Sequence, residues 1–292
     1  MKKISLLIIA IFGLISCNDS SDKADGYGNF EATEITVSSE SNGKIIFLNV
    51  EEGQQLEAQK QVGLIDTLQL YFTKQELFAS KNTVNSKSGN VMSQKSVLAA
   101  QLQTARLEQK RIESMFAENA ATKRQVDEIN GRVSVILEQM KSVGTQNNPI
   151  LNDLKSIDVQ IEKINDQIKK SKITNPINGV VLNKYAEPSE VTGFGKPLYK
   201  IADISEMTLR VFVSETQLPQ VKIGQEVSVK IDDAKEMKTY KGTVSWIAAQ
   251  AEFTPKIIQT KEERVNLVYA IKVKVKNDGS LKIGMPAEMW IK

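Results

Sequence analysis

The sequence has no histidine and only one cysteine, Cys17, in 292 residues. The absence of histidine excludes Ser-His-Asp and Cys-His catalysis, histidine metal sites and histidine pH switches. No glycine-rich phosphate loop or dinucleotide fingerprint appears either. Carboxylate chemistry stays formally possible because Asp and Glu are plentiful. We expect a protein that is not an enzyme, with no catalytic residues and no metal site.

Aromatic residues and excess charge are also scarce. Phe, Trp and Tyr make up 6% of the chain, and 38 basic residues nearly balance 35 acidic ones. The basic residues are scattered and rarely lie beside aromatic ones, which gives little support for binding to nucleic acid. We therefore expect no nucleic-acid partner.

A long hydrophobic run is missing as well. The apolar stretch Ile4–Ile15 has 12 residues, whereas a membrane-spanning helix needs about 20. Because two lysines precede this stretch, it predicts a secretory signal peptide over residues 1–16. The polar, glycine-containing residues 17–30 then predict a flexible tether.

The end of the signal peptide, LISC, resembles the lipobox of bacterial lipoproteins. This resemblance implies cleavage before Cys17 and attachment of lipid to its thiol, with the amine acylated as well. Several acyl chains would give stable membrane anchoring. The alternative is a signal peptide that contains a cysteine by chance.

Residues 67–172 are poor in proline and glycine and carry apolar residues at heptad spacing. In the first arm these are Leu70, Leu77, Val84, Val91, Leu98, Ala105 and Ile112, with Leu102 and Phe116 as a partial second stripe. In the second arm two series stand three residues apart, and they begin at Val126 and Ile129. Such repeats predict a coiled coil. The short break near residues 117–122 makes it an antiparallel hairpin, with arms on the order of 70 Å long.

Gly89 and Pro149 lie about equally far from this tip. Because proline removes a helical hydrogen bond, the pair predicts a bend or local weakening at one level of the hairpin, with both arms resuming beyond it. The alternative is that the helices stop there and a loop intervenes.

Two similar half-motifs flank the hairpin, in residues 31–66 and 173–204. At a constant offset of 136, Gly43 falls on Gly179 and Ile65 on Ile201. Each half combines short apolar strands with turn glycines, for which we single out Gly43, Gly53 and Gly179. Two such halves around a pseudo-twofold axis would form a small flattened barrel.

The split repeat resembles a biotinyl or lipoyl carrier domain with a coiled coil inserted where the modified lysine would be presented. No lysine occupies that tip, so we expect no biotin or lipoate and no cofactor. Residues 205–292 alternate apolar and polar residues, which predicts a β-barrel. The polar stretch 252–266 is interpreted as a barrel loop that is solvated by default; contact with a transporter is the alternative. The expected fold is α+β and elongated.

The order of these elements resembles the HlyD-type membrane fusion proteins. The segments SNGKIIFLNVEEGQQL, NPINGVVLNKYAEPSEV and GKPLYKIADISEMTLRVFVSETQLPQVKIGQEVSV carry the resemblance, and LKIGMPAEM closes it. Ser189 departs from the family, which usually has glycine in that turn. The resemblance implies a periplasmic adaptor in a Gram-negative bacterium, lipid-anchored to the inner membrane and assembled as a trimer or hexamer. Its implied partners are an inner-membrane exporter, ABC-type favoured over proton-driven, and an outer-membrane efflux channel.

In that family the hairpin tip docks on the channel through an Arg, a large apolar residue and a Ser at fixed spacing. Arg111, Met115 and Thr122 stand at this spacing. The alternative assigns them to a solvated helix, the hairpin core and an N-cap. Two other functions stay open: a scaffold lipoprotein that uses its coiled coil as a spacer in the envelope without transport, and an enzyme carrier domain, which the split motif disfavours.

Overall fold

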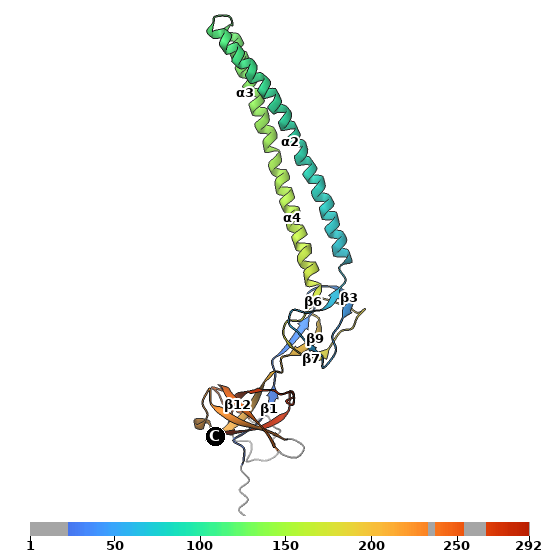
Figure 1. The fold of residues 1–292 in the computed structure, drawn as a ribbon, viewed down its shortest axis with the longest axis vertical. Helices are drawn as coiled ribbons and strands as arrows, with labels where there is room; N and C mark the ends of the chain where they lie inside the picture. The colour runs from blue at the N-terminus through green and yellow to red at the C-terminus, as the bar shows by residue number, and fades with distance from the viewer. Residues whose placement is uncertain (1–22, 233–236, 254–266, 292) are drawn as a thin grey trace, which may run out of the picture.

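The computed structural model describes residues 23–232, 237–253 and 267–291, and places three bodies in a row (Figure 1). A β-barrel lies at one end, a small β-sandwich follows, and a long helical hairpin projects from it. The predicted α+β, elongated fold is confirmed. Within the described ranges, no helix is both long and apolar enough to cross a membrane. The predicted signal peptide and Cys17 lie outside these ranges.

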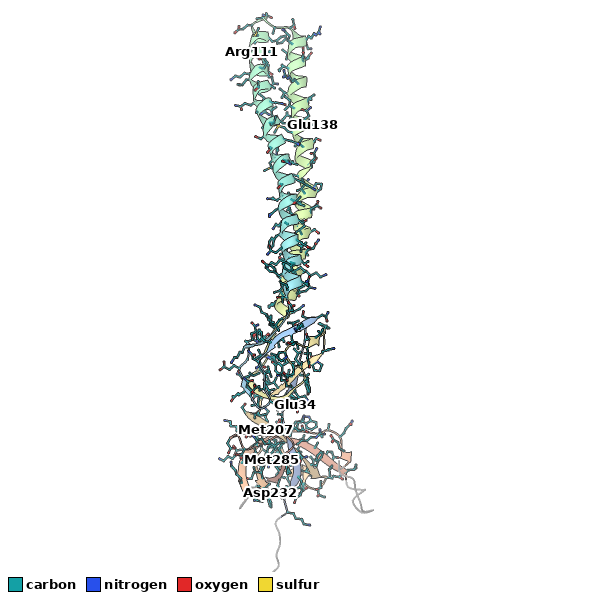
Figure 2. The ribbon with its side chains drawn as sticks, turned by 90° about the vertical axis from the view of Figure 1, so that its right-hand side faces the viewer. Glu34, Arg111, Glu138, Met207, Asp232 and Met285 are labelled. Atoms are coloured by element: carbon teal, nitrogen blue, oxygen red, sulfur yellow. The ribbon has the colours of Figure 1, made fainter. Side chains whose placement is uncertain are left out.

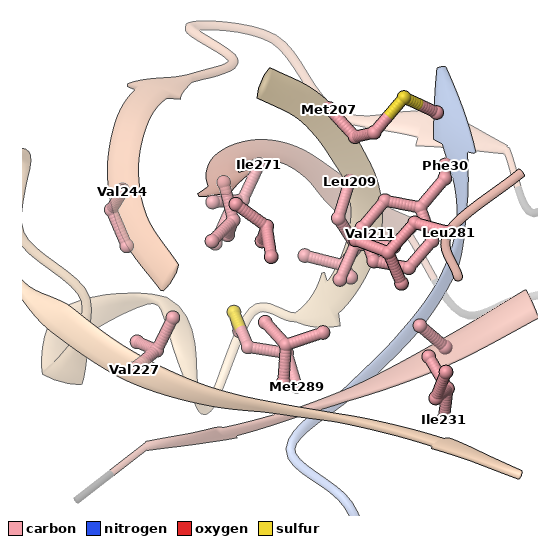
Figure 3. Close-up of a cluster of buried hydrophobic side chains, with 14 of the residues drawn as sticks. Phe30, Met207, Leu209, Val211, Val227, Ile231, Val244, Ile271, Leu281 and Met289 are labelled. Atoms are coloured by element: carbon pink, nitrogen blue, oxygen red, sulfur yellow. The ribbon is translucent and has the colours of Figure 1, made fainter. Parts of the chain in front are cut away.

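The barrel closes six antiparallel strands in the order β10-β1-β15-β11-β12-β14, with β14 returning to β10 and β13 added beside β14. Their bounds are β1 Gly26–Glu31, β10 Glu206–Ser214, β11 Glu226–Asp232, β12 Met237–Ile247, β13 Glu252–Phe253, β14 Leu267–Lys276 and β15 Pro286–Ile291, and a short 3-10 helix, η1, spans Leu218–Gln220. Alternate residues of these strands fill the interior (Figure 3), where Phe30, Leu209 and Met289 are fully buried.

The N-terminal part of the barrel corrects one prediction. Residues 26–30 were assigned to a flexible tether, but they lie in β1, between β10 and β15. Phe30 packs in the core, and the Asp25 carboxylate accepts a hydrogen bond from the Ile291 N–H at 2.7 Å. A Cβ on Gly28 would lie 1.8 Å from the carbonyl oxygen of Arg210. This glycine therefore serves close strand packing, not flexibility.

Part of the predicted loop 252–266 is also a strand. Glu252 and Phe253 form β13, and the Glu252 carboxylate pairs with the Arg210 guanidinium at 2.9 Å. The remainder, residues 254–266, lies outside the described residues.

The sandwich, called here the lipoyl-like domain, consists of residues 34–65 and 172–202 in two four-stranded sheets. The first half gives β2 Glu34–Ser38, β3 Gly43–Leu48, β4 Gln55–Leu56 and β5 Gln61–Ile65, and the second gives β6 Lys172–Thr174, β7 Gly179–Lys184, β8 Val191–Thr192 and β9 Pro197–Ala202. The sheet orders are β2-β9-β7-β4 and β6-β5-β3-β8. At the offset of 136 each strand maps onto its counterpart in the other sheet, so each half contributes two strands to both sheets.

Repeated contacts support this symmetry. A Cβ on Gly43 would lie 2.9 Å from the Ile65 side chain, and one on Gly179 would lie 3.1 Å from the Ile201 side chain and 2.5 Å from the Ala202 carbonyl oxygen. Gly43 and Gly179 begin strands β3 and β7. They were predicted as turn glycines, and the structure corrects this, because tight packing at a strand start excludes a side chain there.

The true turns of the two halves also match. Gly53 and Ser189 share the repeated position of the first turn, with φ of 82° and 76°, and Gln59 and Gly195 share the second, with φ of 63° and 80°. Only glycine adopts this left-handed region without strain. Each half thus has one glycine and one strained residue, in opposite order.

A buried polar group fastens the second half to the first. Asn175 is fully buried, and its amide donates hydrogen bonds to the carbonyl oxygens of Glu57 and Ile177. The Tyr199 hydroxyl donates to the Asn175 side-chain oxygen at 3.0 Å. Burial raises the pKa of this Tyr199 hydroxyl, so it stays protonated and remains a donor.

The hairpin consists of α2 Leu68–Ala117, α3 Lys123–Thr145 and α4 Asn147–Lys170. Every residue of the predicted heptad series is buried or half-buried, but Phe116 of the partial second stripe is exposed. Lys172, the last residue of the predicted hairpin, belongs instead to β6.

Side-chain contacts fix the register between the arms. Gln109 donates to Asn130 at 2.7 Å near the tip, and Lys81 pairs with Asp158 at 2.5 Å nearer the base. Both arms advance by 28 residues between these pairs, which is four heptads. The register therefore continues past Pro149 without a skip.

The two arms differ in structure at the level of Gly89 and Pro149. The second arm is interrupted at Gln146, which alone separates α3 from α4. Pro149 lies in the first turn of α4 and has no N–H to donate to the Thr145 carbonyl, which explains the break. Helix α2 continues unbroken past Gly89. The Ser88 hydroxyl donates to Asn147 at 2.7 Å, so the two positions do lie at one level.

Candidate functional site: the hairpin tip

The tip begins with a tightly bonded helix end. Asn119 adopts φ of 59°, a left-handed conformation that asparagine tolerates. Its N–H donates to the Phe116 carbonyl, and the Ala120 N–H donates to the Met115 carbonyl at 2.7 Å. This pair of bonds is the Schellman motif, which satisfies carbonyls that a helix end leaves without partners. The chain reverses within the five residues 118–122 that separate α2 from α3.

Thr122 begins the second arm. Its hydroxyl accepts from the Gln125 N–H, while the Gln125 side-chain oxygen accepts from the Thr122 N–H at 2.8 Å. This reciprocal capping box satisfies two free donors at the start of α3. The sequence predicted the N-cap role of Thr122, and the structure confirms it. Both helix ends at the tip are therefore fixed by local hydrogen bonds.

Arg111 and Met115 share one face of the last turns of α2, and Figure 2 shows Arg111 near the far end of the hairpin. Leu107 precedes them by one further turn. Residues spaced by four form a continuous ridge on a helix, and we call Leu107, Arg111 and Met115 the tip ridge. Leu107 is 66% exposed and Met115 41% exposed. Met115 is therefore not a core residue.

The tip ridge has one charged group. The Arg111 guanidinium contacts both carboxylate oxygens of Glu108, at 2.7 and 2.5 Å, one turn away on the same helix. The Arg111 side chain is 69% exposed and the Glu108 side chain 37% exposed, and solvent-exposed pairs contribute about 0–1 kcal/mol. Arg111 can exchange Glu108 for another acceptor at little cost.

The structure brings together only part of the predicted set. Arg111 and Met115 are neighbours on α2, whereas Thr122 lies across the turn and has local partners only. Leu107 was missed by the sequence reasoning, although its position outside the heptad series was a usable signal. Phe116 was predicted to face the core, but it is exposed beside Met115 and enlarges the apolar surface of the tip.

Comparisons with known proteins agree with this architecture. Residues 207–291 match a family model described as a YknX-like beta-barrel domain. The chain is 23% identical to the UPF0194 membrane protein in the asrC 5' region of Acidithiobacillus ferridurans, over 91% of this chain and 86% of the relative.

Two solved structures share the fold over most of this chain. MacA from Actinobacillus actinomycetemcomitans has a TM-score of 0.55 at 20% identity, over 90% of this chain and 76% of that one. The membrane fusion protein Spr0693 from Streptococcus pneumoniae has a TM-score of 0.58 at 14% identity, over 91% and 98%. This chain has the membrane fusion protein fold. The hairpin, the lipoyl-like domain and the barrel of this fold are all present in the described residues.

Proposed function

We propose that this chain is a periplasmic adaptor that links an inner-membrane exporter to an outer-membrane channel for efflux or secretion. It performs no chemistry; it forms part of a conduit and couples the exporter to the channel. The observation that carries the proposal is the tip ridge, an exposed apolar and cationic surface on a firmly capped turn at the end of the molecule opposite the barrel (Figure 1).

The hairpin has the dimensions of a spacer. Helix α2 has 50 residues, so its length is about 75 Å at 1.5 Å per residue. Helix α2 is continuous along this length, and the second arm keeps a constant register against it on both sides of the interruption at Gln146. A long stiff element with a defined surface at its end suits a protein that bridges two partners.

The chemistry of the tip ridge suits a protein partner. Arginine and methionine are both enriched at protein–protein interfaces relative to the rest of the surface, and arginine is enriched among the residues that contribute most to binding. Arg111 offers several donors in a fixed fork to carbonyl or carboxylate oxygens of the channel. Met115 and Leu107 would bury apolar surface around that contact. Thr122 contributes by holding the turn in place.

The other end of the molecule would face the membrane. Lipid on Cys17 would hold the barrel near the inner membrane, with only five residues between Cys17 and Lys23, where the described structure begins. We expect an ABC-type exporter as the partner there, and a trimer or hexamer as the working assembly. Purification of the lipidated protein from membranes should bring down an ABC permease subunit; recovery of a proton-driven pump would contradict this exporter class.

Photocrosslinking in cells tests the docking surface. A photoreactive residue at Met115 is expected to form an adduct with an outer-membrane channel protein. Leu137 is a matched control, because it is apolar, also 41% exposed and lies several turns away on α3. An adduct from Met115 and none from Leu137 would support the proposal.

The scaffold alternative predicts a different result. A protein that is expressed and lipidated but gives no channel adduct from Met115 would favour an envelope spacer without transport. In that case deletion of the gene would change envelope integrity and leave efflux intact. The spacing of Arg111, Met115 and Thr122 would then have no docking role.

A further inference from the structure

The outer wall of the barrel carries a groove that crosses strands β10, β1, β15 and β11. We call it the barrel groove, and its lining includes Tyr27, Phe212, Lys230, Asp232, Met237 and Glu288. The groove has a volume of about 610 Å³, within the range of about 300–1,000 Å³ that is usual for small-molecule sites. It lies at the end of the molecule opposite the tip ridge (Figure 1).

The strand register sets the order of the side chains along the barrel groove. Tyr27 on β1 stands directly opposite Phe212 on β10 and directly opposite Glu288 on β15. Glu288 in turn stands opposite Lys230 on β11. Because neighbouring strands lie about 4.8 Å apart, this row of four side chains spans on the order of 14 Å. One end of the groove is therefore aromatic and the other end is charged.

The aromatic end offers a ring face that the described chain does not use. Phe212, Trp246 and Trp290 on the outer wall each have an Arg or Lys cation near the ring, at 5.7, 5.4 and 4.1 Å from the centroid. Tyr27 is 56% exposed, and within the described part of the chain no cation lies over its ring. Aromatic faces attract cations, so Tyr27 can receive one from a ligand.

The charged end of the barrel groove has more carboxylates than cations. Asp232 and Glu288 supply two carboxylates and Lys230 supplies one ammonium, so the described lining carries a net charge of −1. The Lys230 ammonium already lies over the Trp290 ring. The Glu288 carboxylate accepts a hydrogen bond from the Trp290 indole N–H at 3.2 Å, which leaves it further acceptor capacity. This end therefore favours a positively charged group.

We propose that the barrel groove binds a flat organic cation, with its apolar body against the Tyr27 ring and its charge facing Asp232 and Glu288. An anion would meet the excess of carboxylates, and a wholly apolar ligand would desolvate the charged end without pairing it. The inference deepens the proposed adaptor function, because it names a class of cargo that the conduit would carry. The assignment as cargo rests on that function, whereas the binding itself does not.

Titration of rhodamine 6G, a flat cationic dye, with the purified full chain tests the binding through fluorescence anisotropy. Tyr27→Phe should keep the affinity. Tyr27→Leu should raise the Kd about fivefold, because leucine keeps an apolar side chain but removes the ring face. Asp232→Asn combined with Glu288→Gln should raise the Kd by a similar factor of about five. Fluorescein, a flat anion, should bind more weakly than rhodamine 6G.

Two matched variants serve as controls. Tyr185→Leu removes a tyrosine that is 47% exposed outside the groove, and Glu226→Gln removes an exposed carboxylate of β11 outside the groove. Both should leave the Kd for rhodamine 6G unchanged. An absence of saturable dye binding would overturn the proposal, and so would an unchanged Kd in Tyr27→Leu, an equal loss in the controls or equal affinity for fluorescein.

The Met115 channel adduct separates this proposal from the adaptor function, because Met115 lies on α2 and takes no part in the barrel groove. Dye binding without the channel adduct would support the groove and overturn its role toward exported cargo. The channel adduct without dye binding would support the adaptor function and overturn the groove.

Discussion

At the first turn of each half of the lipoyl-like domain, glycine stands in one copy and serine in the other. Gly53 and Ser189 have nearly the same left-handed φ. The Cβ that a substitution would add to Gly53 meets no atom within 4 Å. The only cost of a side chain in this turn is therefore backbone strain, which the domain tolerates once in each half.

This pair gives matched substitutions. Ser189→Gly should stabilise the protein by about 1 kcal/mol, because glycine relieves the left-handed strain at a modest cost in unfolded-chain entropy. Gly53→Ser should destabilise it by a similar amount. Denaturant unfolding of the purified variants measures both. Two changes of the same sign would contradict the assignment of strain to this turn.

Single residues were predictable where their chemistry is local. Thr122 could be identified as an N-cap because Gln125 follows three residues later and completes the capping box. Phe116 could not be placed, since the Schellman turn directly after it ends the heptad geometry.

At the scale of the elements, the length of the hairpin can be tested directly for its role in bridging the two partners. Deletion of residues 95–101 together with 138–144 removes one heptad from each arm at facing positions in the register set by the Gln109–Asn130 and Lys81–Asp158 contacts. The hairpin should fold with both contacts kept and be about 10 Å shorter. We expect loss of export and of the Met115 channel adduct.

Circular dichroism is the control for this deletion, since the helical signal per residue should persist in a shortened but folded hairpin. Unchanged export from the shortened protein would contradict the bridging role. Deletion of 95–101 alone leaves seven residues of the second arm unmatched, and should lower stability more than the paired deletion.

The sequence predicted the hairpin and the repeated half-motifs because their signals are periodic or duplicated. The sequence did not predict β1, because residues 26–30 were assigned to the flexible tether. The segment GYGNFE is short and has glycine at two of six positions. Its partners β10 and β15 lie far away in the sequence, so no local sequence pattern predicts a strand here. The close approach that requires Gly28 exists only once the barrel is closed.

At the scale of the whole molecule, the three bodies are nested in the sequence. The hairpin occupies the centre, the halves of the lipoyl-like domain enclose it, and the barrel uses both outer parts of the described chain. Each body has its two chain ends close together. At the base of the hairpin, for example, the Ile65 N–H donates to the Ser171 carbonyl at 2.9 Å.

This nesting sets an order of folding from the centre outward. The hairpin has the most local contacts, and such elements form fastest. Once formed, it brings β5 and β6 together and removes the entropy cost of closing a long loop for the next body. The barrel must wait for β15, which follows all its other described strands in the sequence. Pulse-labelling hydrogen exchange should show amide protection first in α2 and α3 and last in β1; protection of β1 before the hairpin would refute this order.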